Sequence, residues 1–101
     1  MPMTRDSYSA AELAAFIDHT LLKPEAQAAD IDRTCDEALE HQFAAVCVNS
    51  RWISHVASRL SASNVKPCCV VGFPLGASLP ASVSAETRDA ITAGAQDIDM
   101  V

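Results

Sequence analysis

The segment Ala44-Ala45-Val46-Cys47-Val48-Asn49 decides the fold class of this 101-residue chain. It is a short run that is almost entirely apolar, which predicts a β-strand buried on both faces. Strands of this kind occur in parallel sheets that are covered by helices. The segment therefore predicts an α/β protein in which this strand lies inside a parallel sheet.

The same pattern of strand and helix repeats on both sides of this segment. Further strands are predicted at 17–21, 68–73 and 97–101, and helices at about 28–41, 52–60 and 83–93. A short opening helix is expected after Ser9, because Ser9 and Glu12 have the spacing of a capping box. Gly94 stands where a helix C-cap belongs.

The spacing of equivalent strand positions predicts the architecture. Asp18, Cys47, Val71 and Asp99 are 29, 24 and 28 residues apart, which averages 27. Eight such units need about 216 residues, the size of a small (β/α)₈ barrel of the TIM-barrel type. We therefore expect a half-barrel of about four parallel strands with its helices on one side. Residues 1–101 are interpreted as the N-terminal part of one barrel domain, truncated after the fourth strand.

Composition and charge limit the kinds of partner that this chain is expected to bind. The formal charge of −6 comes from scattered acids, and the seven Lys and Arg residues form no basic stripe, so nucleic acid is not expected. Residues 1–6 do not resemble a signal peptide and no segment is long and apolar enough to span a membrane, which predicts a cytoplasmic protein.

The four cysteines are expected to be reduced thiols, because the chain has enough apolar residues for a core and no secretory signal. Adjacent Cys68 and Cys69 should point to opposite faces of their strand. The chain contains no C-x-x-C or H-x-x-x-H pair, so no metal site is predicted.

Four motifs resemble the deoxyribose-phosphate aldolase family. They are IDHTLLKP (17–24), AVCVN (45–49), VVGFPLGA (70–77) and GAQDIDMV (94–101). They occur in order and at barrel spacing, and the resemblance extends over roughly residues 10–101. The sequence departs from the family at Ser50, where proline is usual, and at Gln27, where a capping threonine is common.

Candidate site residues lie near the ends of the predicted strands. Asp18 and Thr20 share one strand face, and Asp18 is interpreted either as part of a polar network supporting the active site, as the resemblance implies, or as a cap of a backbone turn. His19 faces the other way and is expected to be structural. Cys47 is either a small buried hydrophobe or, by resemblance, a residue near the bound substrate.

Asp97 and Asp99 share one face of the last strand, and Asp97 is expected to cap the preceding loop. Asp99 lies either on an exposed edge strand or toward the barrel lumen. The resemblance implies that it is the acid that hydrogen-bonds the catalytic lysine. The segment 72–76 is either a simple turn or a loop that shapes the barrel mouth, and it lacks the spacing of a dinucleotide-binding loop.

The resemblance implies reversible aldol cleavage of 2-deoxyribose 5-phosphate to glyceraldehyde 3-phosphate and acetaldehyde, through a lysine Schiff base and without a metal or cofactor. The chain contains just Lys23 and Lys66, and neither has a second cation beside it in the sequence. The chain alone is therefore expected to be inactive. Alternatives are a half-barrel fragment that acts only in folding or assembly, and a small phosphate- or cofactor-binding module. Open sheet edges also predict self-association or a homo-oligomer.

Overall fold

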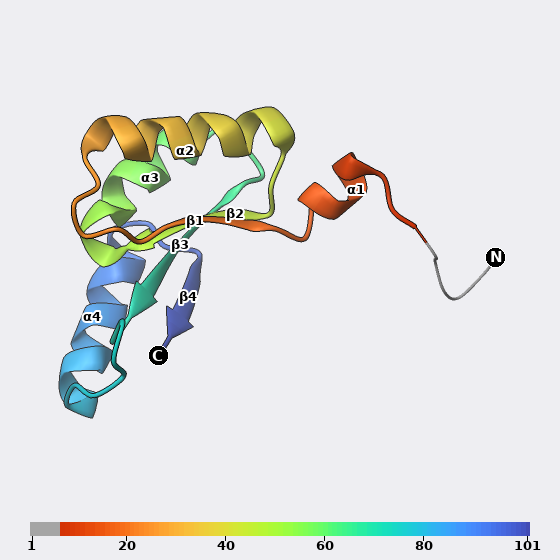
Figure 1. The fold of residues 1–101 in the computed structure, drawn as a ribbon. Helices are drawn as coiled ribbons and strands as arrows, with labels where there is room; N and C mark the ends of the chain where they lie inside the picture. Colours follow the sequence, from red (N-terminus) through yellow and green to blue (C-terminus); the bar gives the residue numbers. More distant parts are fainter. Residues whose placement is uncertain (1–6) are drawn as a thin grey trace.

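Four strands form one parallel sheet with the order β1-β2-β3-β4 in the computed structural model, which describes residues 7–101 (Figure 1). The elements in chain order are α1 (Ala10–Ala14), β1 (Asp18–Leu21), α2 (Ala28–His41), β2 (Ala45–Asn49), the 3₁₀ helix η1 (Ser50–Trp52), α3 (Ile53–Leu60), β3 (Lys66–Val71), α4 (Pro80–Thr92) and β4 (Asp97–Met100). The predicted α/β class and the four parallel strands are confirmed. The N-terminal segment interpreted as lacking a signal peptide, 1–6, lies outside the described residues.

The main core lies between the sheet and its helices, as the sequence predicts. Apolar side chains of α2, α3 and α4 pack on the outward residues of β2 and β3, and Figure 1 shows these helices following one face of the twisted sheet. The fully buried members are Ile31, Cys35, Ala38, Val46, Val48, Val56, Cys69 and Val71. Cys69 belongs to this core whereas Cys68 belongs to the cluster on the other face, so the two cysteines point to opposite faces as expected.

Local signals in the sequence explain where the helices begin and end. The Ser9 side chain accepts from Glu12 N at 3.1 Å and the Glu12 carboxylate accepts from Ser9 N at 3.0 Å, which confirms the capping box. α2 begins after Gln27, whose backbone N–H donates to Asp30 Oδ2 at 2.9 Å. The Asp30 carboxylate of the first turn thus hydrogen-bonds the N-cap residue, which is Gln27 where the resemblance implies threonine.

Several element boundaries differ from those predicted. β3 covers Lys66–Val71 rather than 68–73, because Gly72 adopts a φ of +66° and ends the extended backbone. α4 begins at Pro80, three residues early, since proline suits the first turn of a helix, which needs no N–H donor. The region before Ile53 forms the separate turn η1 rather than the first turn of α3.

Gly94 joins α4 to β4 and permits close packing on α3. Its φ is +117°, and a Cβ atom placed on it would lie 2.5 Å from the Cβ of Ala57. Both the backbone conformation and the contact require glycine. No helix among residues 7–101 has the length and apolar character that crossing a membrane requires.

Candidate active site

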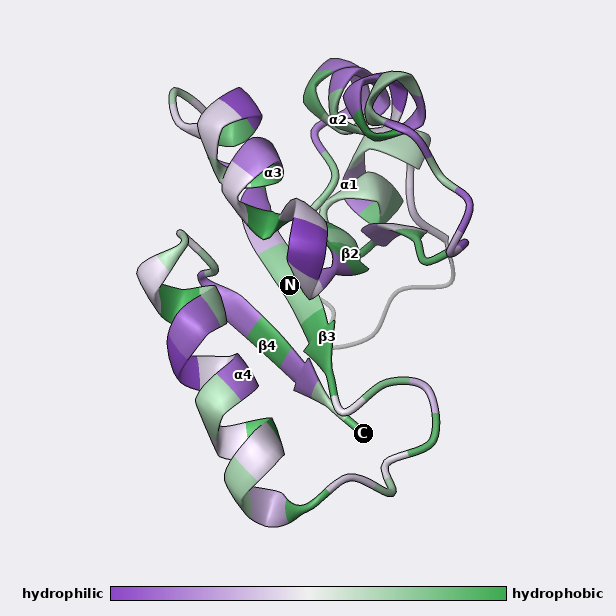
Figure 2. Cartoon of the chain, turned by 90° about the vertical axis from the view of Figure 1, so that its left-hand side faces the viewer, coloured by the Kyte–Doolittle hydropathy of each residue, from purple (hydrophilic) through white to green (hydrophobic). Residues whose placement is uncertain are grey.

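The face of the sheet opposite the helices carries the predicted site residues. Because side chains alternate along a strand, the parallel register places Thr20 beside Cys47, Cys47 beside Cys68, and Cys68 beside Asp97. Asp99 pairs with Val70 on the same face. Figure 2 shows that β4 carries hydrophilic positions beside the largely hydrophobic β3. We call this helix-free side of the sheet the inner face.

Cys47 and Asp99 meet across the inner face. The thiol of Cys47 on β2 donates to Oδ2 of Asp99 on β4 at 3.7 Å, above the intervening strand β3. Cys47 is 2% exposed, whereas Asp99 is exposed to solvent. A buried sulfur therefore holds one oxygen of a carboxylate that remains open to an incoming molecule.

Cys68 is a third member of this group that the sequence did not single out. Its hydrogen bond with Cys47, followed by its burial, raises the pKa of the Cys68 thiol well above the usual range. Cys68 therefore stays protonated near neutral pH. The alternation of strand residues predicts that it faces away from Cys69, but only the register of β2 and β3 reveals that it lies beside Cys47.

The site residues of the first strand are more exposed than Cys47 and Cys68. Asp18 and Thr20 lie on the inner face and are exposed, and the Thr20 hydroxyl donates to the backbone oxygen of Asp18 at 2.8 Å. Neither role considered for Asp18 is decided by this arrangement. His19 points to the helix side, where Nε2 lies 2.9 Å from the Glu37 carboxylate, in keeping with a structural role.

The carboxyl ends of β1, β2 and β3 converge on one rim. Asn49 Nδ2 donates to the backbone oxygen of Leu22 at 3.1 Å, so the end of β2 fixes the loop after β1. A hollow of about 480 Å³ lies here between the three loops. Its lining includes Leu22, Pro24, Asn49, Trp52, Phe73 and Pro74. The segment 72–76 therefore helps to shape this rim.

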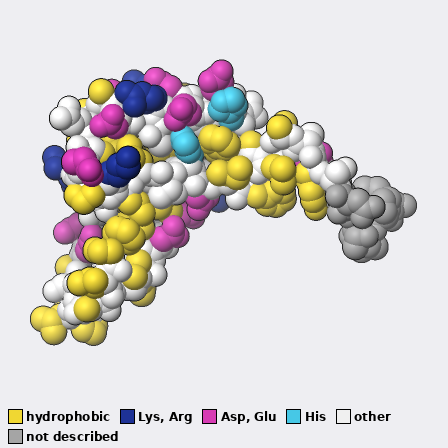
Figure 3. All heavy atoms as spheres, viewed as in Figure 1, with side chains coloured by type: hydrophobic (Ala, Val, Ile, Leu, Met, Phe, Trp, Pro, Cys, Tyr) yellow, Lys and Arg dark blue, Asp and Glu magenta, His cyan; other side chains and the backbone are white. Residues whose placement is uncertain are grey.

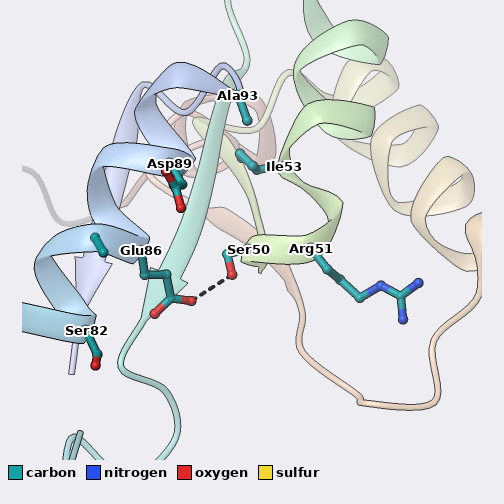
Figure 4. Close-up of a pocket in the computed structure, with 9 residues that line it drawn as sticks. Ser50, Arg51, Ile53, Ser82, Glu86, Asp89 and Ala93 are labelled. Carbon is teal, nitrogen blue, oxygen red and sulfur yellow. Dashed lines mark hydrogen bonds between the residues drawn. The ribbon is translucent and has the colours of Figure 1, made fainter. Parts of the chain in front are cut away.

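Glu86 of α4 ties two of these loops together and was missed by the sequence analysis. Its carboxylate accepts from Ser50 Oγ at 2.7 Å and from Gly72 N at 2.9 Å. Figure 4 shows Glu86 and Ser50 facing each other across a groove of about 600 Å³ on the helix side, with Arg51 directed away. Ser50 is the departure from proline noted above, and its hydroxyl supplies a bond that proline lacks. No sequence motif signals this contact, because the partners are 36 residues apart.

The two lysines lie away from Cys47 and Asp99. Lys66 begins β3, four residues before Val70, which pairs with Asp99, so its backbone is about 13 Å lower along the strand. Lys23 lines a hollow with Arg33 beside α2, on the helix side. Glu25 and Glu37 line the same hollow and Arg33 pairs with Asp30, so Lys23 lies among side chains of mixed charge, remote from the inner face.

Comparison with known proteins identifies the relatives of this arrangement. No protein-family model matches the chain. A deoxyribose-phosphate aldolase from Bdellovibrio bacteriovorus is 57% identical over 90 residues, which are 89% of this chain and 41% of that protein. The chain is homologous to deoxyribose-phosphate aldolases. This homology confirms the resemblance inferred from the four motifs.

Solved structures give the same assignment for the fold. The deoxyribose phosphate aldolase from Aeropyrum pernix, described as a tetramer, aligns with a TM-score of 0.86 and 30% identity over 91% of this chain and 39% of that chain. A candidate deoxyribose-phosphate aldolase from Coccidioides immitis aligns with a TM-score of 0.90 and 33% identity over 95% of this chain and 38% of that chain. The chain thus spans about two fifths of the length of the aldolases it matches, and it has the four parallel strands predicted for a half-barrel.

Proposed function

We propose that residues 1–101 form the N-terminal part of a deoxyribose-phosphate aldolase. In this proposal the complete barrel cleaves 2-deoxyribose 5-phosphate reversibly to glyceraldehyde 3-phosphate and acetaldehyde, in the cytoplasm and as a homo-oligomer. The observation that carries the proposal is the meeting of Cys47 and Asp99 on the inner face, 3.7 Å apart. Both residues belong to motifs shared with the aldolases, and both lie where barrel enzymes bind their substrates, toward the carboxyl ends of the strands.

In this mechanism Asp99 holds and transfers a proton beside the catalytic lysine. Its carboxylate is exposed, so it is accessible to a lysine and substrate placed over the inner face. The thiol of Cys47 fixes the orientation of one carboxylate oxygen through their hydrogen bond. The second oxygen remains available to accept a proton or to stabilise a protonated amine. Asp18 and Thr20 are proposed to support the substrate from β1.

The lysine that forms the Schiff base is proposed to lie outside these 101 residues. A Schiff-base lysine must be close to the substrate and needs a pKa lowered by burial or by a nearby cation. Lys66 is exposed at the amino end of β3, and Lys23 lies on the helix side. Neither lysine lies over the inner face beside Asp99, where the substrate is proposed to bind. The positions of the two lysines also favour the alternative function, a half-barrel that acts only in folding or assembly.

Borohydride trapping distinguishes these possibilities. The chain is incubated with 2-deoxyribose 5-phosphate and borohydride, alone and together with the C-terminal part of the Bdellovibrio bacteriovorus aldolase. We expect a trapped adduct only in the mixture, on a lysine of the added part. An adduct on Lys23 or Lys66 would contradict the proposal. Absence of an adduct and of cleavage from a folded complex would favour the fragment that acts only in assembly.

A further inference from the structure

Three metal-binding side chains come together on the inner face. The Sγ atoms of Cys47 and Cys68 and a carboxylate oxygen of Asp99 all lie within 4.8 Å of one another. They come from three adjacent strands, β2, β3 and β4. The absence of a metal-binding motif in the sequence does not bear on such a group, because those motifs describe ligands that are near one another in the chain.

The spacing of these atoms suits a tetrahedral site. With metal–sulfur bonds of about 2.3 Å and metal–oxygen bonds of about 2.1 Å, a sulfur and an oxygen bound to one tetrahedral ion are about 3.6 Å apart. The Cys47 sulfur and Asp99 Oδ2 are 3.7 Å apart. Two sulfurs on such an ion are about 3.8 Å apart, and the 4.8 Å limit on the group leaves at most a small side-chain adjustment for Cys68.

We propose that Cys47, Cys68 and Asp99 bind a thiophilic divalent cation, with Zn²⁺ as the representative ion. Two sulfurs and one carboxylate form a three-residue site with a fourth position open to water, and sulfur ligands select zinc over magnesium or calcium. Binding forms two metal–sulfur bonds and one metal–oxygen bond. Each thiol loses a proton to solvent, so one bound Zn²⁺ replaces two protons.

The burial of the two sulfurs and the exposure of the carboxylate determine from which side an ion can enter the site. Cys47 is 2% and Cys68 0% exposed, whereas the Asp99 carboxylate is exposed. An ion therefore arrives on the side of Asp99 and reaches the sulfurs from there. Unpaired thiolates are costly in buried surroundings, and the cation supplies the charge that compensates them. If the proposed aldolase function holds, the ion binds the Asp99 carboxylate that the reaction uses, so it acts as an inhibitor rather than as a cofactor.

The test is a calorimetric titration of the reduced, metal-free 101-residue chain with Zn²⁺. Co²⁺ is used in parallel, because cobalt–thiolate bonds give a characteristic charge-transfer absorption. We expect one ion per chain and a thiolate band with Co²⁺. The Cys47→Ala and Cys68→Ala variants should lose more than the roughly 10- to 100-fold in affinity that removal of an outer partner of a metal site costs. This readout does not depend on aldolase activity, so it fails or succeeds separately from the proposed function.

Cys69→Ala is the matched control, because it removes a buried thiol one residue away that faces the helices. It should bind Zn²⁺ as the unmodified chain does. Asp99→Asn keeps the shape of an exposed side chain, so it decides the matter even where a cysteine variant fails to fold, and we expect it to weaken binding by at least about tenfold. Lack of Zn²⁺ binding by the unmodified chain, a Co²⁺ complex without a thiolate band, or equal binding by Asp99→Asn would overturn the proposal.

Discussion

The thiol of Cys47 donates to the carboxylate of Asp99 across 52 positions of sequence, at a distance of 3.7 Å. The two residues lie on β2 and β4, so their contact depends on β3 holding those strands in register. The carboxylate is thereby held by a buried sulfur on one side and open to solvent on the other. This relationship underlies both the proposed aldolase site and the proposed metal site.

Asp99→Asn should reduce aldol cleavage by about 10²- to 10⁴-fold once the remaining part of the barrel is supplied, because the amide cannot take up a proton as the carboxylate does. The fold should be retained, since the side chain is exposed and the shape is nearly unchanged. Cleavage rates of the two complexes check this expectation, with Cys47→Ala measured alongside. Equal rates for Asp99→Asn and the unmodified chain would show that Asp99 has no catalytic role.

The isolated chain should self-associate. β1 and β4 each pair with one neighbour among the described residues, and open strand edges promote pairing between molecules. Large apolar side chains are also exposed, including Phe16 at 77% and Leu75 at 84%. Figure 3 shows hydrophobic side chains gathered over the arm of the molecule that contains α4. Sedimentation velocity should show oligomers that grow with concentration, and a compact monomer with a sharp two-state melt would count against this prediction.

Glu86→Ala should lower the free energy of unfolding by about 1–3 kcal/mol, because it removes the acceptor for Ser50 Oγ and Gly72 N. The loops after β2 and β3 lose their common partner, so substrate binding by a completed barrel should weaken as well. Urea denaturation measures the stability change. Asp89→Ala is the control, since Asp89 is an exposed carboxylate that lines the same groove, and an equal loss in both variants would argue against a specific role for Glu86.

Gly94→Ala should destabilise the chain by about 2 kcal/mol or more. The added Cβ would lie 2.5 Å from the Cβ of Ala57 and would hold a φ of +117° that side chains disfavour. A lower midpoint of thermal unfolding is the expected measurement. Ser54→Ala, at an exposed position of α3, should change stability by less than about 0.5 kcal/mol. A normal melting midpoint for Gly94→Ala would show that α3 and α4 can separate without cost.

Stability should fall with rising pH above about pH 9, and the buried thiols of Cys35 and Cys69 should contribute to this fall. Burial raises the pKa of Cys35 and of Cys69 from 9.0 to about 11. The unfolded chain therefore loses these protons at lower pH than the folded chain, so the stabilisation is complete below pH 9 and is lost as the pH approaches 11. Urea denaturation under reducing conditions at a series of pH values follows this loss. A Cys35→Ala, Cys69→Ala double variant should show a smaller alkaline loss, and an unchanged slope would contradict the assignment.

The sequence by itself determined the fold class and the direction of most strand residues. Apolar runs such as Ala45–Asn49 can be buried on both faces only within a covered parallel sheet, so periodicity was sufficient to predict four strands and their helices. Alternation along a strand likewise placed Asp18 with Thr20 and separated Cys68 from Cys69. The ends of elements were less well predicted, because β3 ends where Gly72 turns and α4 begins where Pro80 is tolerated.

Only the tertiary structure decided which residues meet. Contacts between strands depend on register and on the curvature of the sheet, and neither quantity is encoded in the spacing of residues along one strand. The structure therefore brought Cys68 beside Cys47 and brought Asp99 over β3 to the same sulfur. It also joined Glu86 to the loops after β2 and β3, since a helix packed on a sheet selects its partners by position in space rather than by order in the chain.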